Sequence, residues 1–310
     1  MKSAALLLLL VAGLMLCAQP ILASDQRAEE LLKEARAAIG GEEALQKIQS
    51  LSMKGPYRRA LGDREMSGER EVSIMLPDKY LNEDSLSQGS LSTAMIMTRG
   101  LNGEKAWNTS SGGGMGHGGM VIRMAGPGSA GQQATPEQME AMFRRVHGLE
   151  LSRYLLATLL MPAPSLTVQY TYAGETNVED TTAEAIDVTG PGNFSVRLFF
   201  DKQTHLPLLL SYRGPKPRIV TSFARAADGA KTEDAVKKAR EDAEKKVAAE
   251  VPAKPDEVDF FIRMTEYKKV NGVLLPHKLT FLTETDVSEQ FEVAKYQLNP
   301  SFNADKCQMT

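Results

Sequence analysis

The sequence predicts an α+β protein built on one strongly curved antiparallel β-sheet, an unclosed half-barrel. Two long stretches, 51–110 and 166–298, alternate apolar and polar residues with a period of two, which is typical of strands with one buried face. The connections between successive strands are too short for crossover helices, so neighbouring strands run antiparallel. The strands number about a dozen, which is more than an open sheet carries without curling.

The first 24 residues are expected to be a cleaved secretory signal peptide. The run Ala4–Leu16 is apolar and follows a lysine, and small residues end the segment at Ala23 and Ser24. The apolar run is shorter than a membrane-spanning helix requires. A lipidated Cys17 is the alternative, which is disfavoured because the residue before a lipidated cysteine should be small and leucine stands there.

A helix is expected over 25–39, because apolar residues recur there at helical spacing and Gly40-Gly41 ends the run. The first group of strands follows. The segment 111–131 is rich in glycine and predicts a flexible connection, in which 121–124 form a short strand.

A second helix begins at Thr135, where Thr135-Pro136-Glu137-Gln138 combines a capping residue, a proline at the first helical position and a glutamine three residues on. Beyond Gly148 the helix is apolar around nearly its whole circumference, up to Met161. Such a helix is buried on all sides or lies against an apolar partner that is not protein. We expect it to lie across the mouth or the inside of the curved sheet.

The stretch Asn193–Tyr212 predicts a hairpin that anchors the second group of strands. Its return strand from Leu206 is apolar on both faces and therefore needs cover on its second face. Pro207 cannot donate to a ladder, which predicts an edge or a bulge at this point. A second bulge is expected in the last strand, because the phase of its apolar residues shifts between Val293 and Tyr296.

The segment 225–256 is expected to be a helical insertion, with a charged, solvated helix over 231–250. The chain returns afterwards to the same strand period, so no domain boundary is predicted. The mature chain, 25–310, is therefore one domain.

Composition and motifs argue against several classes of function. The chain has 310 residues and a net charge of −3, which predicts no nucleic-acid binding. It has two cysteines, Cys17 and Cys307, too few for a disulfide framework. Its four histidines show no spacing typical of a catalytic metal site, so we expect neither an enzyme nor a cofactor.

A copper site is the alternative function that the residues leave open. Met115, His117, Met120 and Met124 are soft donors that could hold Cu(I) in an oxidising compartment. Methionine is also a common gap-filler at adaptable apolar surfaces, which disfavours this interpretation.

Four blocks of the sequence resemble the LolA/LolB-like superfamily of periplasmic outer-membrane lipoprotein-sorting proteins. They read ARAAIGGEEAL at 35–45, RLFFDKQTHLP at 197–207, YKKVNGVLLPH at 267–277 and YQLNPSF at 296–302. The resemblance implies an unclosed barrel whose concave apolar face, covered by helices, holds acyl chains. It also implies a periplasmic location and a membrane-associated donor or acceptor protein as partner.

The leading hypothesis is therefore a periplasmic carrier or sensor of a hydrophobic ligand, a lipid or the acyl chains of a lipoprotein. We expect an elongated apolar cavity beside Leu155 and Leu159. A non-catalytic envelope scaffold, the remaining alternative, predicts a packed interior with no space for a ligand. The residues expected to contact the ligand are Trp107, Leu151, Tyr154, Leu155, Leu159, Phe199 and Leu209.

Overall fold

A computed structural model of the chain describes residues 19–61, 64–87, 94–112, 120–124, 135–216, 219–223 and 256–302. Several predictions lie outside these ranges. They concern residues 1–18 of the expected signal peptide, the copper candidates Met115 and His117, the helix expected over 231–250, and Cys307.

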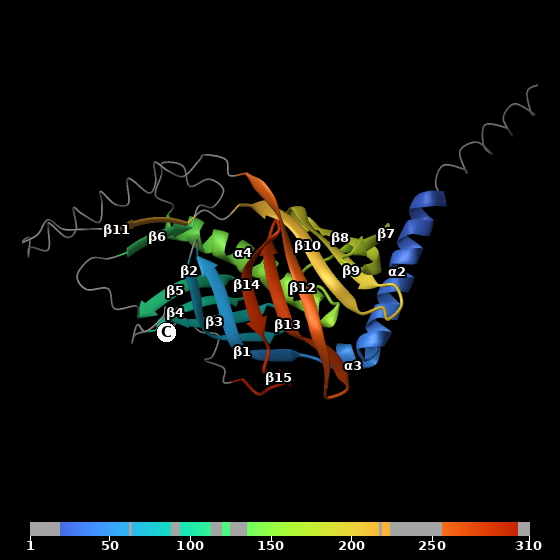
Figure 1. Cartoon of the computed structure of the whole chain (residues 1–310), viewed down its shortest axis with the longest axis horizontal. Coiled ribbons are helices and arrows are strands. Elements are labelled where there is room, and N and C mark those ends of the chain that lie inside the picture. Colours follow the sequence, from blue (N-terminus) through green and yellow to red (C-terminus); the bar gives the residue numbers. More distant parts are fainter. Residues whose placement is uncertain are drawn as a thin grey trace, which may run out of the picture.

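The molecule is organised around one unclosed antiparallel sheet of 13 strands, which confirms the predicted fold class (Figure 1). The order is β5-β4-β3-β2-β1-β14-β13-β12-β10-β9-β8-β7, so β5 and β7 form the two edges, and β15 also pairs with β1. The strands are β1 Ser50–Leu61, β2 Arg64–Met75, β3 Lys79–Ser87, β4 Met95–Asn102, β5 Lys105–Gly112, β7 Gln169–Val178, β8 Thr181–Gly190, β9 Phe194–Asp201, β10 Pro207–Pro215, β12 Glu257–Val270, β13 Val273–Thr283, β14 Asp286–Glu292 and β15 Lys295–Leu298.

Two strands form a small sheet of their own. The predicted short strand is present as β6, Met120–Met124, and it pairs with β11, Ile219–Phe223. The sequence predicts a strand at 218–223 but not its partner. Pairing between segments almost a hundred residues apart is decided by tertiary contacts rather than by local pattern.

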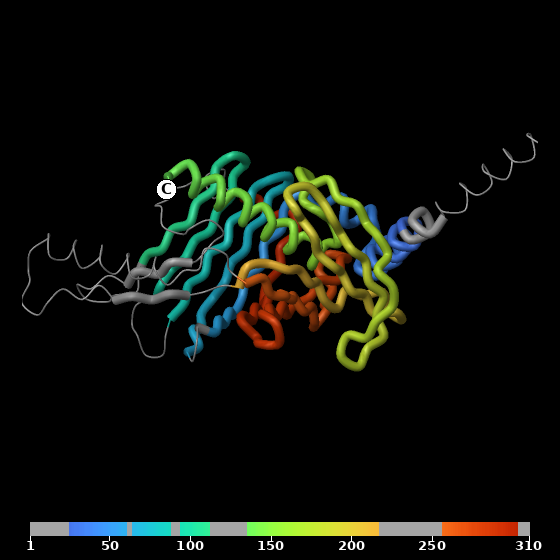
Figure 2. Tube along the Cα trace, turned by 90° about the horizontal axis from the view of Figure 1, so that it is seen from above, coloured from blue at the N-terminus to red at the C-terminus, as the bar shows by residue number. Residues whose placement is uncertain are grey.

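Both helices that the sequence predicts are present. The first, α2, covers Gln19–Ile39, so it begins inside the segment expected to be removed as a signal peptide. It packs along the edge strand β7 and is followed by the short α3, Glu42–Gln46. The second, α4, covers Pro136–Leu159 and crosses the concave side of the sheet from β4 and β5 toward β10 and β13 (Figure 2). A single 3-10 turn, η1, covers Pro191–Asn193.

The main core lies between these helices and the concave face of the sheet. Every second residue of a strand faces inward, as Val196, Leu198 and Phe200 do on β9. Buried residues of α2 and α4 join them in one continuous cluster. Half-covered strands and apolar helix stripes therefore bury each other.

Both predicted bulges are found in the structure. The β9–β10 register shifts between Pro207 and Leu209. The last strand breaks between Glu292 and Lys295 into β14 and β15, which both pair with β1. Gly55 of β1 lies against this break, and a Cβ atom there would stand 2.0 Å from the Glu292 carbonyl oxygen.

Within the described part of the chain, no helix combines the length and the apolar character needed to cross a membrane.

Candidate ligand-binding face

The position of α4 over the sheet is set at both of its ends. At the start, the Gln138 amide donates to Thr135 Oγ1 at 3.3 Å and the Thr135 amide donates to Gln138 Oε1 at 3.0 Å, the predicted capping box. At the end, Leu160 adopts a left-handed conformation. Its carbonyl accepts two hydrogen bonds from the guanidinium of Arg36 in α2, at 3.2 and 3.0 Å. The last turn of α4 is thus capped by another helix.

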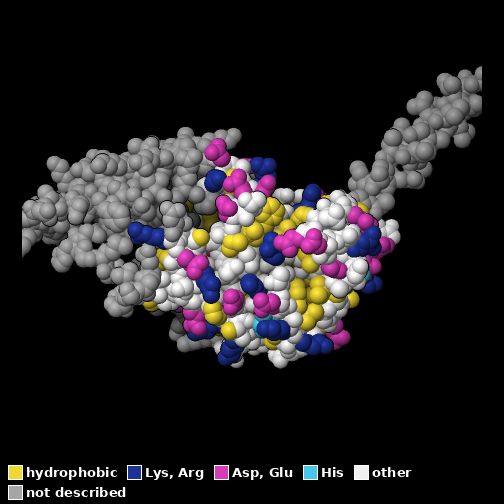
Figure 3. All heavy atoms as spheres, viewed as in Figure 1, with side chains coloured by type: hydrophobic (Ala, Val, Ile, Leu, Met, Phe, Trp, Pro, Cys, Tyr) yellow, Lys and Arg dark blue, Asp and Glu magenta, His cyan; other side chains and the backbone are white. Residues whose placement is uncertain are grey.

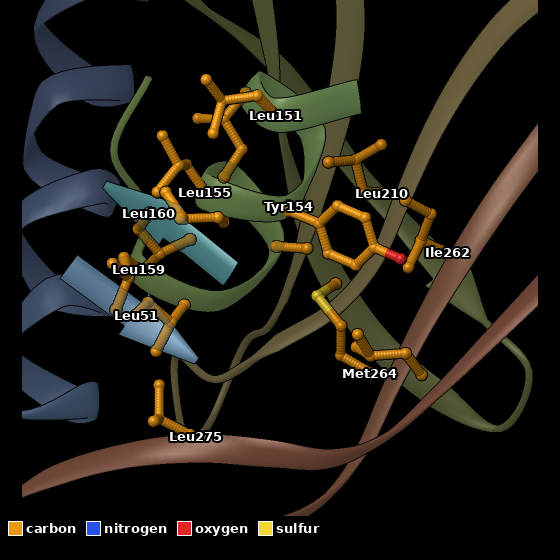
Figure 4. Packing of buried hydrophobic residues seen from close by; sticks show 14 of the residues in the cluster. Leu51, Leu151, Tyr154, Leu155, Leu159, Leu160, Leu210, Ile262, Met264 and Leu275 are labelled. Atoms are coloured by element: carbon orange, nitrogen blue, oxygen red, sulfur yellow. The ribbon is translucent and has the colours of Figure 1, made fainter. Parts of the chain in front are cut away.

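The C-terminal half of α4 is enclosed by the sheet. Leu151, Tyr154, Leu155 and Leu159 are between 0% and 3% exposed. Figure 4 shows them packed among side chains from four strands, Leu51, Leu210, Ile262, Met264 and Leu275. These four residues of α4 are the part of the predicted ligand contacts that the structure brings together.

The prediction of an elongated apolar cavity beside Leu155 and Leu159 is wrong, because the space beside these residues is filled. A void large enough for water would leave exposed area on its lining, and Leu155 is 1% and Leu159 0% exposed. The apolar side chains of the helix itself fill the space that the sequence assigned to a ligand. A hollow of about 400 Å³ lies elsewhere, between α3 and the β13 end of the sheet, and is lined by Gly40, Glu43, Ala44, Lys47, Ile48, Asn271, Val273, Leu298 and Asn299.

The N-terminal half of α4 covers the sheet less completely. Met139, Met142 and Val146 form an outward stripe that is 41%, 40% and 48% exposed. Phe143 packs against the edge of the core, and Met66 of β2 and Met97 of β4, which face the concave side, are only half-buried. The described residues therefore leave the concave apolar surface incompletely covered at its β2–β5 end.

Three predicted contacts lie away from the concave face. Phe199 and Leu209 stand opposite each other across β9 and β10 and are half-buried on the convex face, because their inward-facing neighbours are Leu198 and Leu210. Trp107 packs against Leu81 in a separate small cluster and covers Gly100. Alternation along a strand decides the face, and in the sequence Phe199 is already in phase with the polar Ser195 and Arg197, which indicates the outward face.

Among the residues that the structure describes, no helix covers the convex face of the hairpin's return strand, although the sequence predicted cover there. Pro207 and Leu210 are buried, whereas Leu208 and Leu209 keep part of their surface exposed. Figure 3 views the side turned away from α4, where apolar side chains stand between charged ones.

A buried ionic cluster occupies the concave face beneath α4. Arg70 of β2 is 1% exposed and donates to both carboxylate oxygens of Asp84 on β3, at 2.6 and 2.9 Å. Its guanidinium also reaches Glu289 of β14 at 3.1 Å and the Tyr154 hydroxyl of α4 at 3.4 Å. The ring of Tyr57 lies below it, 3.6 Å from the guanidinium carbon. The centre of the concave face is therefore charged.

The cluster extends to α4 through a second arginine. Arg99 of β4 bridges Asp84 at 3.1 Å and Glu150 of α4 at 3.0 Å. Burial raises the pKa of Glu289, but the nearby Arg70, Arg59 and Arg99 outweigh it and lower the pKa to about 2. These contacts attach the middle of the helix to the sheet by charge as well as by packing.

Sequence reasoning missed this cluster, although a signal was present. Arg70 stands in phase with the inward-facing Val72 and Ile74, and Asp84 in phase with Tyr80 and Leu86. Charged residues at inward positions of two adjacent strands indicate a buried ion pair, because an unpaired buried charge is strongly unfavourable.

No group of three or more histidine, cysteine, aspartate or glutamate side chains in the described ranges is arranged to hold a metal ion. Of the copper candidates, Met120 and Met124 are described as the two ends of β6, where they stand opposite Phe223 and Ile219.

Comparison with known proteins finds similarity in structure but not in sequence. No protein-family model and no curated protein sequence matches the chain. Three solved structures align over most of it. A LolA superfamily protein from Nitrosomonas europaea is 10% identical, with 88% of this chain and 94% of that chain covered and a TM-score of 0.40.

The other two solved structures have similarly low sequence identities and TM-scores. A putative outer membrane lipoprotein-sorting protein domain from Vibrio parahaemolyticus is 7% identical, with 92% and 97% covered and a TM-score of 0.43. A DUF1329 family protein from Desulfovibrio piger is 9% identical, with 90% and 95% covered and a TM-score of 0.40. Two of the three names are those of the superfamily that four blocks of the sequence resemble.

Proposed function

We propose that this protein binds a hydrophobic ligand, a lipid or the acyl chains of a lipoprotein, on the concave face of its half-barrel. We propose further that it does so in the periplasm, as a non-enzymatic carrier or sensor that exchanges the ligand with a membrane-associated protein. The single observation that carries the proposal is the uneven cover that α4 provides. Its C-terminal half is buried, whereas Phe143 of its N-terminal half and the inward-facing Met66 and Met97 of the sheet remain half-buried.

Because the space beside Leu155 and Leu159 is filled, ligand binding would require part of α4 to move. A ligand would take the place of α4 on the sheet and would enter at the β2–β5 end, where the cover is thinnest. Each buried methylene of an acyl chain contributes about 0.8 kcal/mol, which offsets the contacts that α4 loses. The helix and the ligand then compete for one apolar surface.

A matched pair of substitutions on β4 tests the proposal. Met97 faces inward under α4, whereas its neighbour Ile96 is 44% exposed on the convex face. Protein purified without detergent is extracted with organic solvent, and the lipid is quantified by mass spectrometry. Met97→Glu is expected to lower lipid occupancy, because its carboxylate would meet the acyl chain, and Ile96→Glu is expected to leave occupancy unchanged.

Hydrogen exchange provides a second, independent measurement. Added oleate is expected to accelerate exchange in 136–147 of α4, because the ligand enters at the β2–β5 end and competes with this half of the helix for the sheet, and to leave α2 unchanged. The packed interior favours one other candidate, a non-catalytic envelope scaffold. A scaffold would carry no lipid, and the exchange rates in α4 would not respond to oleate. That pair of results would contradict the carrier proposal.

A further inference from the structure

Arg153 of α4 lies in a different environment from the other arginines of the concave face. Its guanidinium carbon stands 3.6 Å from the ring centroid of Tyr212 on β10. That ring stacks in turn on Phe260 of β12, at 5.1 Å and 12° between planes. In the described part of the chain Arg153 has no hydrogen bond and no ion pair, and its Nε is enclosed.

The neighbouring charges explain why Arg153 has no carboxylate partner. Arg70 and Arg99 share Asp84, Arg70 and Arg59 share Glu289, and Arg99 engages Glu150. Four guanidiniums thus meet three carboxylates around this part of α4. One positive charge remains, and Arg153 holds it. An enclosed N–H without an acceptor among the described residues is rare in folded proteins, and water, an ion or a ligand is the usual explanation.

We propose that Arg153 binds the anionic headgroup, a carboxylate or a phosphate, of an amphiphile whose acyl chain lies on the concave face. This rests on the proposed function and specifies its ligand class. The planar guanidinium fork matches either anion with two parallel hydrogen bonds. Part of the Arg153 side chain stays exposed, so a headgroup can reach it without unfolding the helix.

The strand register is consistent with one ligand that places its headgroup at Arg153 and its acyl chain on the concave face. One row of inward-facing residues runs across the sheet from Met66, where the cover is thin, to Leu210. The row consists of Met66, Arg59, Glu289, Phe281, Ile262 and Leu210. Tyr212 is the next inward residue beyond Leu210. The anion site and the proposed entry for the acyl chain are therefore at the same end of the strands.

Affinity measurements with three probes test the inference: oleate, monoolein (the same chain with a neutral headgroup) and inorganic phosphate. Arg153→Met is expected to weaken oleate binding about tenfold or more and to leave monoolein binding unchanged, because only the charged hydrogen bonds are lost. Arg153→Lys keeps the positive charge but lacks the planar guanidinium. Its affinity for oleate is expected to lie between those of the wild type and Arg153→Met. Neither substitution leaves a buried carboxylate unpaired, so both variants are expected to fold.

Arg213→Met is the matched control. Arg213 is the next residue after Tyr212, its side chain is 66% exposed and it stands 3.6 Å from Asp259. This variant is expected to bind oleate like the wild type. Equal oleate affinity of the wild type and Arg153→Met, with monoolein still bound, would overturn the Arg153 assignment alone. Binding of phosphate through Arg153 without any oleate binding would identify a free anion and overturn the amphiphile. Failure of both lipids to bind would refute the proposed function together with this inference.

Discussion

Arg70 and Asp84 stand directly opposite each other on β2 and β3 and form a two-pronged ion pair, at 2.6 and 2.9 Å, in which both side chains are 1% exposed. The same arrangement recurs on the outside of the sheet. Arg197 and Asp187 stand opposite each other on β9 and β8 at 2.6 and 2.8 Å, with side chains 46% and 35% exposed. The two pairs share this geometry but differ in burial, and the buried pair has three further partners, Arg99, Glu289 and Tyr154.

We expect Asp84→Asn to lower the free energy of unfolding by about 3–5 kcal/mol, because it leaves buried arginine charge uncompensated. Asp187→Asn should cost less than about 1 kcal/mol, since water solvates the arginine that it leaves behind. Urea unfolding followed by circular dichroism measures both. Similar losses in the two variants would mean that burial does not decide the strength of these pairs.

The stability of the fold is expected to fall as the pH drops below about 6.5, the ordinary pKa of histidine. Burial lowers the pKa of His147, on the buried side of α4, so the folded state binds fewer protons than the unfolded state. The contribution of His147 is fully present above the unfolded pKa. It is lost progressively between that value and the lower folded pKa.

Urea midpoints measured from pH 8 to pH 5 check this expectation with His147→Phe, which cannot titrate. The variant should lose less stability than the wild type over this range. A residual slope is expected from His277, whose pKa burial also lowers. A wild-type and a variant curve of identical slope would exclude His147 as a source of acid sensitivity.

Substitution by alanine is expected to change the free energy of unfolding in opposite directions at two glycines. Gly148 lies inside α4, and a Cβ atom there would meet nothing within 4 Å. Gly148→Ala should therefore raise the free energy of unfolding by about 1 kcal/mol through helix propensity. Gly55→Ala should destabilise the fold strongly, because its Cβ would collide with the backbone at the break between β14 and β15. Thermal unfolding of both variants distinguishes them, and a destabilising Gly148→Ala would show that α4 needs a flexible point there.

Local pattern determined most of the architecture from the sequence alone. The capping signals at Thr135 and the alternation along the strands depend on neighbours within a few residues, and both are found in the structure. The bulge at Pro207 follows from the chemistry of one residue, which has no amide to donate.

Tertiary structure decided which face each strand buried and what filled the concavity. Phe199 and Trp107 are as apolar as their inward-facing neighbours, so composition could not show that they lie outside the main core. The space expected for a ligand is occupied by α4, because its apolar side chains satisfy the sheet as an acyl chain would. The pairing of Arg70 with Asp84 and the unpaired Arg153 depend on register between strands and on the position of a helix over them. These relationships join residues distant in the chain, and only the folded structure brings them together.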